Sequence, residues 1–346
     1  MKYLLFVLTL GLCLVACQPS NTDKKIDTST ISIIKEPSFK TTGSIERLTD
    51  AINELIPKEA KIEVLAEGFT WTEGPLWVAD GRYLLFSDIP PNRIMKWSEK
   101  EGVSLYLTPS GYTGEIARQG ESGSNGLLLD DTGNLILCQH GDRRLAKMTT
   151  ALTNPQPQFE TIVDNYQGKK LNSPNDAIYD SRGNLYFTDP PYGLVGQVND
   201  PTKELAFQGV YRYSKEGQLT LITDKLTRPN GIGLSPDEKT LYVACSDPKA
   251  ATWTAFSLNE DGTVAEERLF YDATGNEEKG LPDGLKVDKK GNIWATGPGG
   301  VWVFNPEGEV LGKIKTGQAT SNCAFDDKYQ TLYMTCDDYL MRLKLQ

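Results

Sequence analysis

The chain has 346 residues, of which 39% are hydrophobic and 24% charged, and its 36 basic and 46 acidic side chains give a net charge of −10. This composition is that of a globular protein and excludes wholesale disorder. The acidic balance repels phosphate backbones, so we expect no nucleic-acid partner. A single histidine, His140, excludes a zinc site built from several histidines, and six cysteines over this length do not predict a disulfide scaffold.

Residues 1–16 have the pattern of a bacterial lipoprotein signal peptide. Lys2 precedes an apolar run, and Leu14-Val-Ala-Cys17 resembles the lipobox, in which the cysteine is lipidated and becomes the mature N-terminus. The alternative is an ordinary secretory signal with an incidental cysteine. We expect a lipid anchor at Cys17 in the cell envelope. Because Gln18 follows the cysteine, the anchor belongs in the outer membrane or on the periplasmic side if the cell has two membranes.

Two short segments precede the main domain. Residues 17–43 are polar and without period, which predicts a flexible tether that ends in the lipidated cysteine. Over residues 44–57 the apolar residues fall at helical spacing, with Ser44 as a cap and Pro57 as a stop, so we expect a short helix there.

Residues 58–346 contain a repeat with a period near fifty residues. Each unit begins with a strand, a tight polar turn and a second strand, and two further strands follow, which is the pattern of propeller blades. The last unit has only three strands, whereas one unpaired strand near residues 61–66 precedes the first unit. That strand can complete the last blade and remove the exposed edge. The fold class is therefore all-β, a six-bladed β-propeller whose ring is closed by an N-terminal strand.

The first residue of each unit is expected at one mouth of the central channel, because the innermost strand of each blade lines that channel. All six residues carry a side-chain oxygen: Glu73, Asn125, Asn175, Asn230, Asp283 and Asn322. Carboxylate and carboxamide oxygens that converge on one axis favour a hard divalent cation. The competing interpretation is turn chemistry, since Asn-Gly and Asp-Gly are common in hairpin turns.

Other polar residues are expected on the same face. If the first strand of a blade leaves this mouth, the second returns to it, so the loops that follow the second strands surround the ring. These loops carry His140 and Tyr192, which we expect to contact a substrate together with Asn125. The long polar connection 108–124 would form a rim or lid.

Several motifs in this region resemble a known family. They are Glu73-Gly-Pro-Leu-Trp77, Leu171-Asn-Ser-Pro-Asn-Asp176, Phe187-Thr-Asp-Pro-Pro-Tyr-Gly193, Arg228-Pro-Asn-Gly231 and Pro282-Asp-Gly-Leu285. In order and spacing they are similar to those of gluconolactonases in the regucalcin (senescence marker protein) superfamily, and Cys138-Gln-His-Gly-Asp-Arg-Arg144 resembles the bacterial branch. The resemblance implies a six-bladed propeller, a calcium-type cation and hydrolysis of sugar lactones.

Site roles carry over from this resemblance at matching positions. It implies Glu73, Asn230 and Asp283 as direct metal ligands, with Asn175 at both the metal and the substrate, and with Asp176 beside it as a substrate contact. Ca²⁺ is the expected ion, with Mg²⁺, Mn²⁺ or Zn²⁺ as alternatives. The animal branch has an arginine where this chain has Ser173, so its sugar preference does not transfer.

The implied reaction is attack of water on the carbonyl of a lactone such as glucono-1,5-lactone, with the cation as Lewis acid. Asp283, or alternatively Glu73, would accept the proton. Two other interpretations stay open: a lipid-anchored propeller that binds a sugar or peptide without catalysis, and an arylesterase-like hydrolase on the same fold. We expect a monomer. A disulfide between Cys323 and Cys336 is a further hypothesis, with buried free thiols as the alternative.

Overall fold

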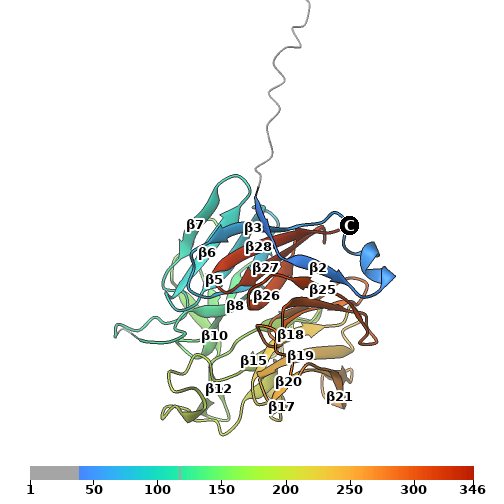
Figure 1. The fold of residues 1–346 in the computed structure, drawn as a ribbon. Helices are drawn as coiled ribbons and strands as arrows, with labels where there is room; N and C mark the ends of the chain where they lie inside the picture. The colour runs from blue at the N-terminus through green and yellow to red at the C-terminus, as the bar shows by residue number, and fades with distance from the viewer. Residues whose placement is uncertain (1–38, 117) are drawn as a thin grey trace, which may run out of the picture. The chain divides into compact units, whose positions relative to one another are not determined.

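The computed structural model describes residues 39–116 and 118–346, so the signal peptide, Cys17 and most of the expected tether lie outside the described residues. Within these ranges the strands form six antiparallel sheets of four or five strands, arranged as the blades of a propeller, and one two-stranded hairpin (Figure 1). The predicted all-β, six-bladed propeller is confirmed.

The blades follow one another in chain order. Blades 1 and 2 consist of β4 (Thr72–Val78), β5 (Tyr83–Asp88), β6 (Arg93–Ser98) and β7 (Gly102–Leu107), and of β8 (Ser124–Leu129), β9 (Leu135–Gln139), β10 (Arg144–Met148) and β11 (Phe159–Val163). Blades 3 and 4 consist of β14 (Ala177–Tyr179), β15 (Leu185–Asp189), β16 (Gly209–Tyr213) and β17 (Leu219–Thr223), and of β18 (Pro229–Leu234), β19 (Thr240–Asp247), β20 (Ala250–Leu258) and β21 (Val264–Asp272). Blades 5 and 6 contain β22 (Leu285–Val287), β23 (Ile293–Gly297), β24 (Gly300–Phe304) and β25 (Val310–Lys315), and β26 (Thr320–Phe325), β27 (Thr331–Cys336) and β28 (Tyr339–Lys344). The small elements outside the blades are the hairpin β12 (Asn165–Tyr166) and β13 (Lys169–Lys170) and the 3₁₀ helix η2 (Gln197–Asn199).

The ring closes as predicted. Strand β3 (Ile62–Glu67) pairs antiparallel with β28, with Ile62 opposite Leu343 and Glu67 opposite Tyr339. It thereby becomes the fourth strand of blade 6, although it lies at the opposite end of the chain (Figure 1). Strand β1 (Lys40–Thr42) pairs with the outer edge of β3. The expected tether therefore ends before residue 40.

The prediction of a helix over residues 44–57 is wrong. Residues Ser44–Arg47 form strand β2, which pairs with β25 and adds a fifth strand to blade 5. Only a 3₁₀ helix follows, η1 (Asp50–Glu54), and no helix in the described residues is long and apolar enough to cross a bilayer. The open edge of β25 supplies backbone partners that outweigh a weak helical pattern, whose Ile52 and Ile56 are buried in either case.

The first hairpin turns of blades 2, 3 and 5 share the same local hydrogen bonds. In blade 2 Asp130 Oδ1 accepts hydrogen bonds from the backbone N–H groups of Thr132 and Asn134, while Asn134 Nδ2 donates to Asp130 Oδ2. The intervening Gly133 has a φ of +82°, which glycine adopts without strain. The same contacts recur at Asp180–Asn184 and Asp288–Asn292. The repeated Asp-x-x-Gly-Asn pattern therefore marks these turns.

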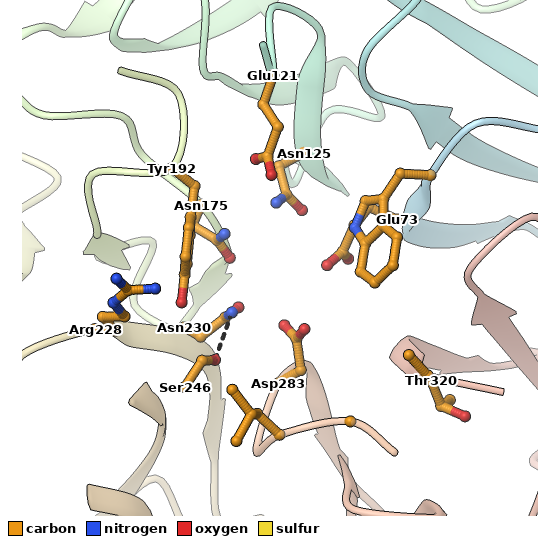
Figure 2. Close-up of a pocket in the computed structure, with 14 residues that line it drawn as sticks. Glu73, Glu121, Asn125, Asn175, Tyr192, Arg228, Asn230, Ser246, Asp283 and Thr320 are labelled. Carbon is orange, nitrogen blue, oxygen red and sulfur yellow. Dashed lines mark hydrogen bonds between the residues drawn. The ribbon is translucent and has the colours of Figure 1, made fainter. Parts of the chain in front are cut away.

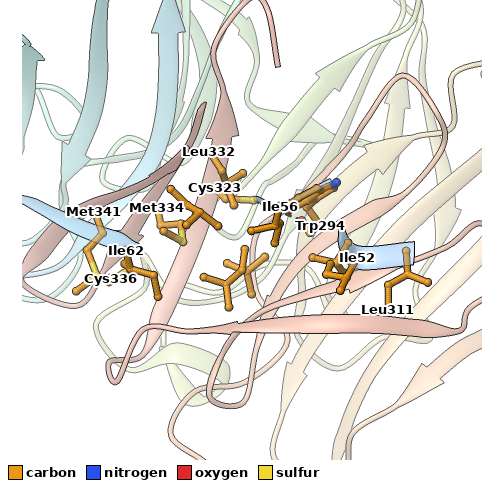
Figure 3. Close-up of a cluster of buried hydrophobic side chains, with 14 residues drawn as sticks. Ile52, Ile56, Ile62, Trp294, Leu311, Cys323, Leu332, Met334, Cys336 and Met341 are labelled. Atoms are coloured by element: carbon orange, nitrogen blue, oxygen red, sulfur yellow. Dashed lines mark hydrogen bonds between the residues drawn. The ribbon is translucent and has the colours of Figure 1, made fainter. Parts of the chain in front are cut away.

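Apolar side chains fill the space between neighbouring blades. Figure 3 shows the cluster in which η1, β3 and blades 5 and 6 meet, with Ile52, Trp294, Cys323 and Cys336 buried together. The four cysteines in the described part of the chain are free and buried. The disulfide hypothesis for Cys323 and Cys336 is therefore wrong, because Cys323 pairs across the hairpin with Met334 and Cys336 pairs with Thr320.

Candidate active site

A cavity of about 330 Å³ lies where the inner strands begin. Five of the six predicted ring residues line it, from five different blades: Glu73, Asn125, Asn175, Asn230 and Asp283. Figure 2 shows their side chains directed from separate blades toward a common centre. The sixth, Asn322, is buried beside this group and is not part of the lining.

Irregular strand pairing directs these side chains toward the axis of the central channel. In blades 1, 2 and 4 the pairing of the inner strand shifts register directly after Glu73 and across Asn125 and Asn230. A bulge of this kind redirects a side chain that would otherwise follow the regular alternation. The competing turn interpretation is therefore excluded for these residues, because they lie within inner strands and the hairpin turns come later.

The glycines after the ring residues allow adjacent blades to approach closely. A Cβ at Gly126 would lie 2.7 Å from the carbonyl oxygen of Asn175, and a Cβ at Gly231 would lie 2.2 Å from that of Asp283. Both distances are too short for any side chain. The Asn-Gly pairs thus serve the packing of one blade against the next.

Hydroxyl groups at the ends of the second strands fix the ring from blade to blade. Ser87 Oγ donates to the carbonyl of Asn125, Thr188 Oγ1 to that of Asn230, and Ser246 Oγ to that of Pro282. In each case the acceptor belongs to the first residues of the next blade. These bonds hold the backbone of the ring residues without using the oxygens that face the cavity.

Two aspartates anchor the segments that lead into the ring. Asp88 Oδ1 accepts hydrogen bonds from the backbone N–H groups of Thr70 and Trp71, just before Glu73. Asp189 accepts from the N–H groups of Asn172 and Ser173, just before Asn175. A carboxylate that accepts two backbone hydrogen bonds holds the loop in one course and leaves its backbone little freedom.

The two ring carboxylates face each other in a poorly solvated space. Burial, reinforced by the negative charge of Asp176, raises the pKa of Glu73 to about 8, against a weaker opposing hydrogen bond from the Gly74 N–H. Burial, followed by the charge of Glu73, raises the pKa of Asp283 well above its usual range. Like charges this close are unfavourable unless protons or a cation neutralise them.

The oxygen atoms fit a hard cation. Asn125 Oδ1, Asn175 Oδ1 and Asp283 Oδ1 are buried and have no hydrogen-bond donor. Asn230 donates its amide to Ser246 Oγ at 2.8 Å, which leaves its carbonyl oxygen for the cavity (Figure 2). Unpaired buried oxygens carry a desolvation cost that a bound cation removes. In residues 39–116 and 118–346 no three His, Cys, Asp or Glu side chains are grouped as metal ligands, so this site depends on asparagines.

The structure separates the predicted substrate contacts into two sets. Tyr192 and Asn125 line the cavity beside Asn175. His140 is fully buried behind the wall, and Asp176 lines a second cavity of about 510 Å³ together with Lys286. Asp176 Oδ2 lies 3.6 Å from Lys286 Nζ. The roles of His140 and Asp176 as substrate contacts stay predictions.

Among the lining residues that the sequence did not predict are Glu121, Trp71 and Arg228. Glu121 lies in the connection expected to form a rim, but no motif singled it out. Arg228 belongs to the Arg-Pro-Asn-Gly motif and lies with its guanidinium 5.7 Å from the ring of Tyr192. Trp71 comes two residues before Glu73 and offers an aromatic face.

Residues 71–337 match the family described as SMP-30/Gluconolactonase/LRE-like region. The chain belongs to this family. A gluconolactonase of Zymomonas mobilis is 39% identical over 315 residues, which cover 88% of this chain and 86% of that protein. A pentonolactonase of Haloferax volcanii is 26% identical over 76% of this chain and 80% of that protein. Among solved structures, that of a gluconolactonase from Xanthomonas campestris has a TM-score of 0.76 and 32% identity, covering 90% of this chain and 99% of that chain.

Membership of the SMP-30/gluconolactonase family agrees with the motifs on which the resemblance was based. The matched range begins at Trp71 and includes every ring residue from Glu73 to Asn322. It also contains Glu121, which the motifs did not include.

Proposed function

We propose that this protein is a lactone hydrolase that opens sugar lactones such as glucono-1,5-lactone to the aldonic acid. One observation carries the proposal: the ring residues of five blades bring two carboxylates and three carboxamides to a single cavity. The names of the relatives support it, since two of them are a gluconolactonase and a pentonolactonase. A cavity of about 330 Å³ has room for a single sugar ring.

A divalent cation completes the proposed site. Glu73, Asn175, Asn230 and Asp283 would hold it, because their oxygens lie at the cavity and two of them bring negative charge. An all-oxygen set with two carboxylates suits Ca²⁺, and also Mg²⁺ or Mn²⁺, better than Zn²⁺. When bound, the cation supplies Lewis acidity toward the carbonyl oxygen of the lactone.

The remaining side chains would bind and orient the sugar. Trp71 offers a flat apolar face for one side of the ring. Arg228 and Tyr192 donate hydrogen bonds from the opposite wall, where the guanidinium and the phenol lie together. This guanidinium comes from blade 4, whereas the position occupied by arginine in the animal branch is Ser173 here, whose hydroxyl donates to the Pro190 carbonyl.

The test is acid release from a panel of aldonolactones, followed in a pH-stat above the spontaneous rate. We expect turnover that is lost on chelation and restored by Ca²⁺. Asp283→Asn and Asn175→Ala should each lower kcat/KM at least about a hundredfold, whereas Asp131→Asn, at an exposed turn, should not. Wild-type rates in both site variants would remove the assignment. No turnover of any lactone by a protein that binds Ca²⁺ would favour the non-catalytic binder.

We further propose that the protein is anchored in the cell envelope through a lipid on Cys17. The lipobox-like Leu14-Val-Ala-Cys17 supports this proposal. Expression with a labelled fatty acid should give a labelled membrane-bound protein, and Cys17→Ser should give an unlabelled protein released from the membrane. Labelling that persists in the serine variant would overturn the anchor.

We also propose a monomer. In the described residues only a few large apolar side chains are exposed, with Leu105, Ile116 and Leu269 among them. Light scattering of the detergent-solubilised protein at several concentrations tests this. A dimer mass at all concentrations would contradict it.

A further inference from the structure

Glu121 and His140 form a pair at the cavity wall, and neither residue belongs to the proposed set of metal ligands. Glu121 Oε2 lies 3.1 Å from His140 Nδ1. The imidazole is fully buried, and neither of its nitrogens has a hydrogen bond of good geometry. The carboxylate is one-third exposed and extends into the cavity, opposite Asp283 (Figure 2). A buried imidazole without a hydrogen-bond partner is unusual, and here its Nδ1 lies beside a carboxylate of the cavity.

The loop that carries Glu121 is held against His140 by several contacts. The His140 N–H donates to the carbonyl of Gly123 at 3.1 Å. Arg118, on the same loop, donates to the carbonyls of Gly141 and Gly193, which lie next to His140 and Tyr192. These contacts join the loop to the connections that follow β9 and β15. Glu121 is therefore positioned by the fold, although its loop has no regular secondary structure.

We infer that Glu121 is the residue that moves the proton during lactone opening and that His140 is the positioning residue that orients its carboxylate. This inference rests on the proposed function. With its proton on Nδ1, the imidazole can donate to Glu121 Oε2, which leaves Oε1 directed to the cavity.

Water is the co-reactant that opens the lactone in the proposed step. The oxygen of water forms a bond to the carbonyl carbon, and the proton that it loses goes to Glu121. The tetrahedral oxyanion then collapses, the bond between the carbonyl carbon and the ring oxygen breaks, and Glu121 returns the proton to that ring oxygen. The products are a carboxyl group and a hydroxyl group, and Glu121 ends as a carboxylate.

The other groups in the cavity are less suited to this step. Glu73 and Asp283 are the charged members of the proposed ligand set, and a carboxylate that neutralises a cation is a weaker base than a free one. Tyr192 is a phenol whose pKa is raised by burial and then by the charge of Asp283, so it stays protonated. Arg228 has no proton acceptor to offer. Of the groups in the described lining, Glu121 is thus the carboxylate that is available for proton transfer.

The first experiment measures kcat and KM of the full chain with glucono-1,5-lactone and Ca²⁺. Glu121→Gln should lower kcat about 10²- to 10⁴-fold with KM unchanged. Glu115→Gln, an exposed residue of the same loop, is the matched control and should keep the wild-type kcat. A wild-type kcat in Glu121→Gln would overturn the inference while the lactonase proposal stands. A wild-type protein that opens no lactone would overturn both.

The positioning role is tested at His140 itself. His140→Leu should lower kcat about tenfold or more, and His140→Asn, whose amide can replace Nδ1 as donor, should restore most of that loss. Circular dichroism and the melting temperature check that both variants fold. Equal rates in the leucine, asparagine and wild-type proteins would overturn this role.

A second readout needs no turnover, because His140 is the single histidine of the chain. In an untagged protein labelled with ¹⁵N-histidine, NMR should show a proton on Nδ1. Glu121→Ala should move that proton to Nε2. An Nε2–H ring in the wild-type protein would overturn the contact on which the inference is built.

Discussion

Asn322 Nδ2 donates a hydrogen bond to Glu73 Oε2 at 3.3 Å, which joins the first and last blades across 249 positions of sequence. The same nitrogen lies 3.4 Å from Asp176 Oδ2, and Asn322 Oδ1 lies 3.3 Å from Lys286 Nζ. Asn322 therefore does not line the cavity but holds one of its carboxylates from behind. The hydrogen bond also lowers the pKa of Glu73, in opposition to the larger effect of burial.

Replacement of Asn322 should weaken the proposed cation site without removing a ligand. Residues that orient metal ligands typically contribute about 10- to 100-fold in affinity. We expect Asn322→Ala to lower Ca²⁺ affinity by about tenfold in isothermal titration calorimetry, with an unchanged stoichiometry. Asn154→Ala, in an exposed loop, serves as the control. An unchanged dissociation constant in Asn322→Ala would show that the bond does not support the site.

Cation binding and stability should both depend on pH. The pKa of Glu73 is raised to about 8 in the folded protein, so without a cation the folded state binds a proton that the unfolded state has lost. The stability from that proton is complete below about pH 4.5 and is lost as the pH rises through about 8. A bound cation takes the place of this proton. At pH values below the pKa of Glu73, Ca²⁺ affinity should therefore increase as the pH rises, by up to about tenfold per pH unit for each proton displaced.

Thermal melting with Ca²⁺ or with chelator at pH 6 and pH 8.5 measures this dependence. The increase in melting temperature given by Ca²⁺ should be larger at pH 8.5. The same increase at both pH values would contradict competition between the proton and the cation.

The closing strand should be a main contributor to stability. Ile62 of β3 is 1% exposed in the cluster between blades 5 and 6. Ile62→Ala should lower the free energy of unfolding by about 2–5 kcal/mol, because it leaves a cavity at the ring closure. Leu269→Ala, at a side chain that is 59% exposed, should change it by less than about 0.5 kcal/mol. Urea denaturation compares the two, and equal midpoints would contradict the packing described here.

The buried thiols should be unreactive in the native protein. Burial raises the pKa values of Cys323 and Cys336 to about 12, so neither forms a thiolate at neutral pH. Treatment with iodoacetamide and peptide mass spectrometry should show no alkylation of either cysteine in the native protein and complete alkylation of both in guanidinium chloride. A peptide pair linked by a disulfide would contradict the structure.

The sequence alone was sufficient to predict the six blades and the ring of oxygen-bearing residues at the mouth of the channel. In blades 2, 3 and 5 the first hairpin has a turn that is stabilised by its own Asp, Gly and Asn, as at Asp130 to Asn134, so these strands can be recognised locally. The repeat then places the opening residues on one axis, because every blade has the same relation to the channel. The repeat therefore predicts that Glu73, Asn230 and Asp283 lie at one mouth of the channel.

The tertiary structure decided what local patterns do not encode. Glu121 reaches the cavity from an irregular loop, and His140 lies behind it, because contacts between three separate connections fix both. Asp176 follows Asn175 directly, yet the direction of its side chain takes it to a second cavity beside Lys286. Residues 44–47 became a strand because an unpaired edge of blade 5 was available to them. Hydrogen-bonded turns and strand alternation are set by neighbours in sequence, whereas the course of a loop and the capping of a sheet edge depend on partners that folding brings together.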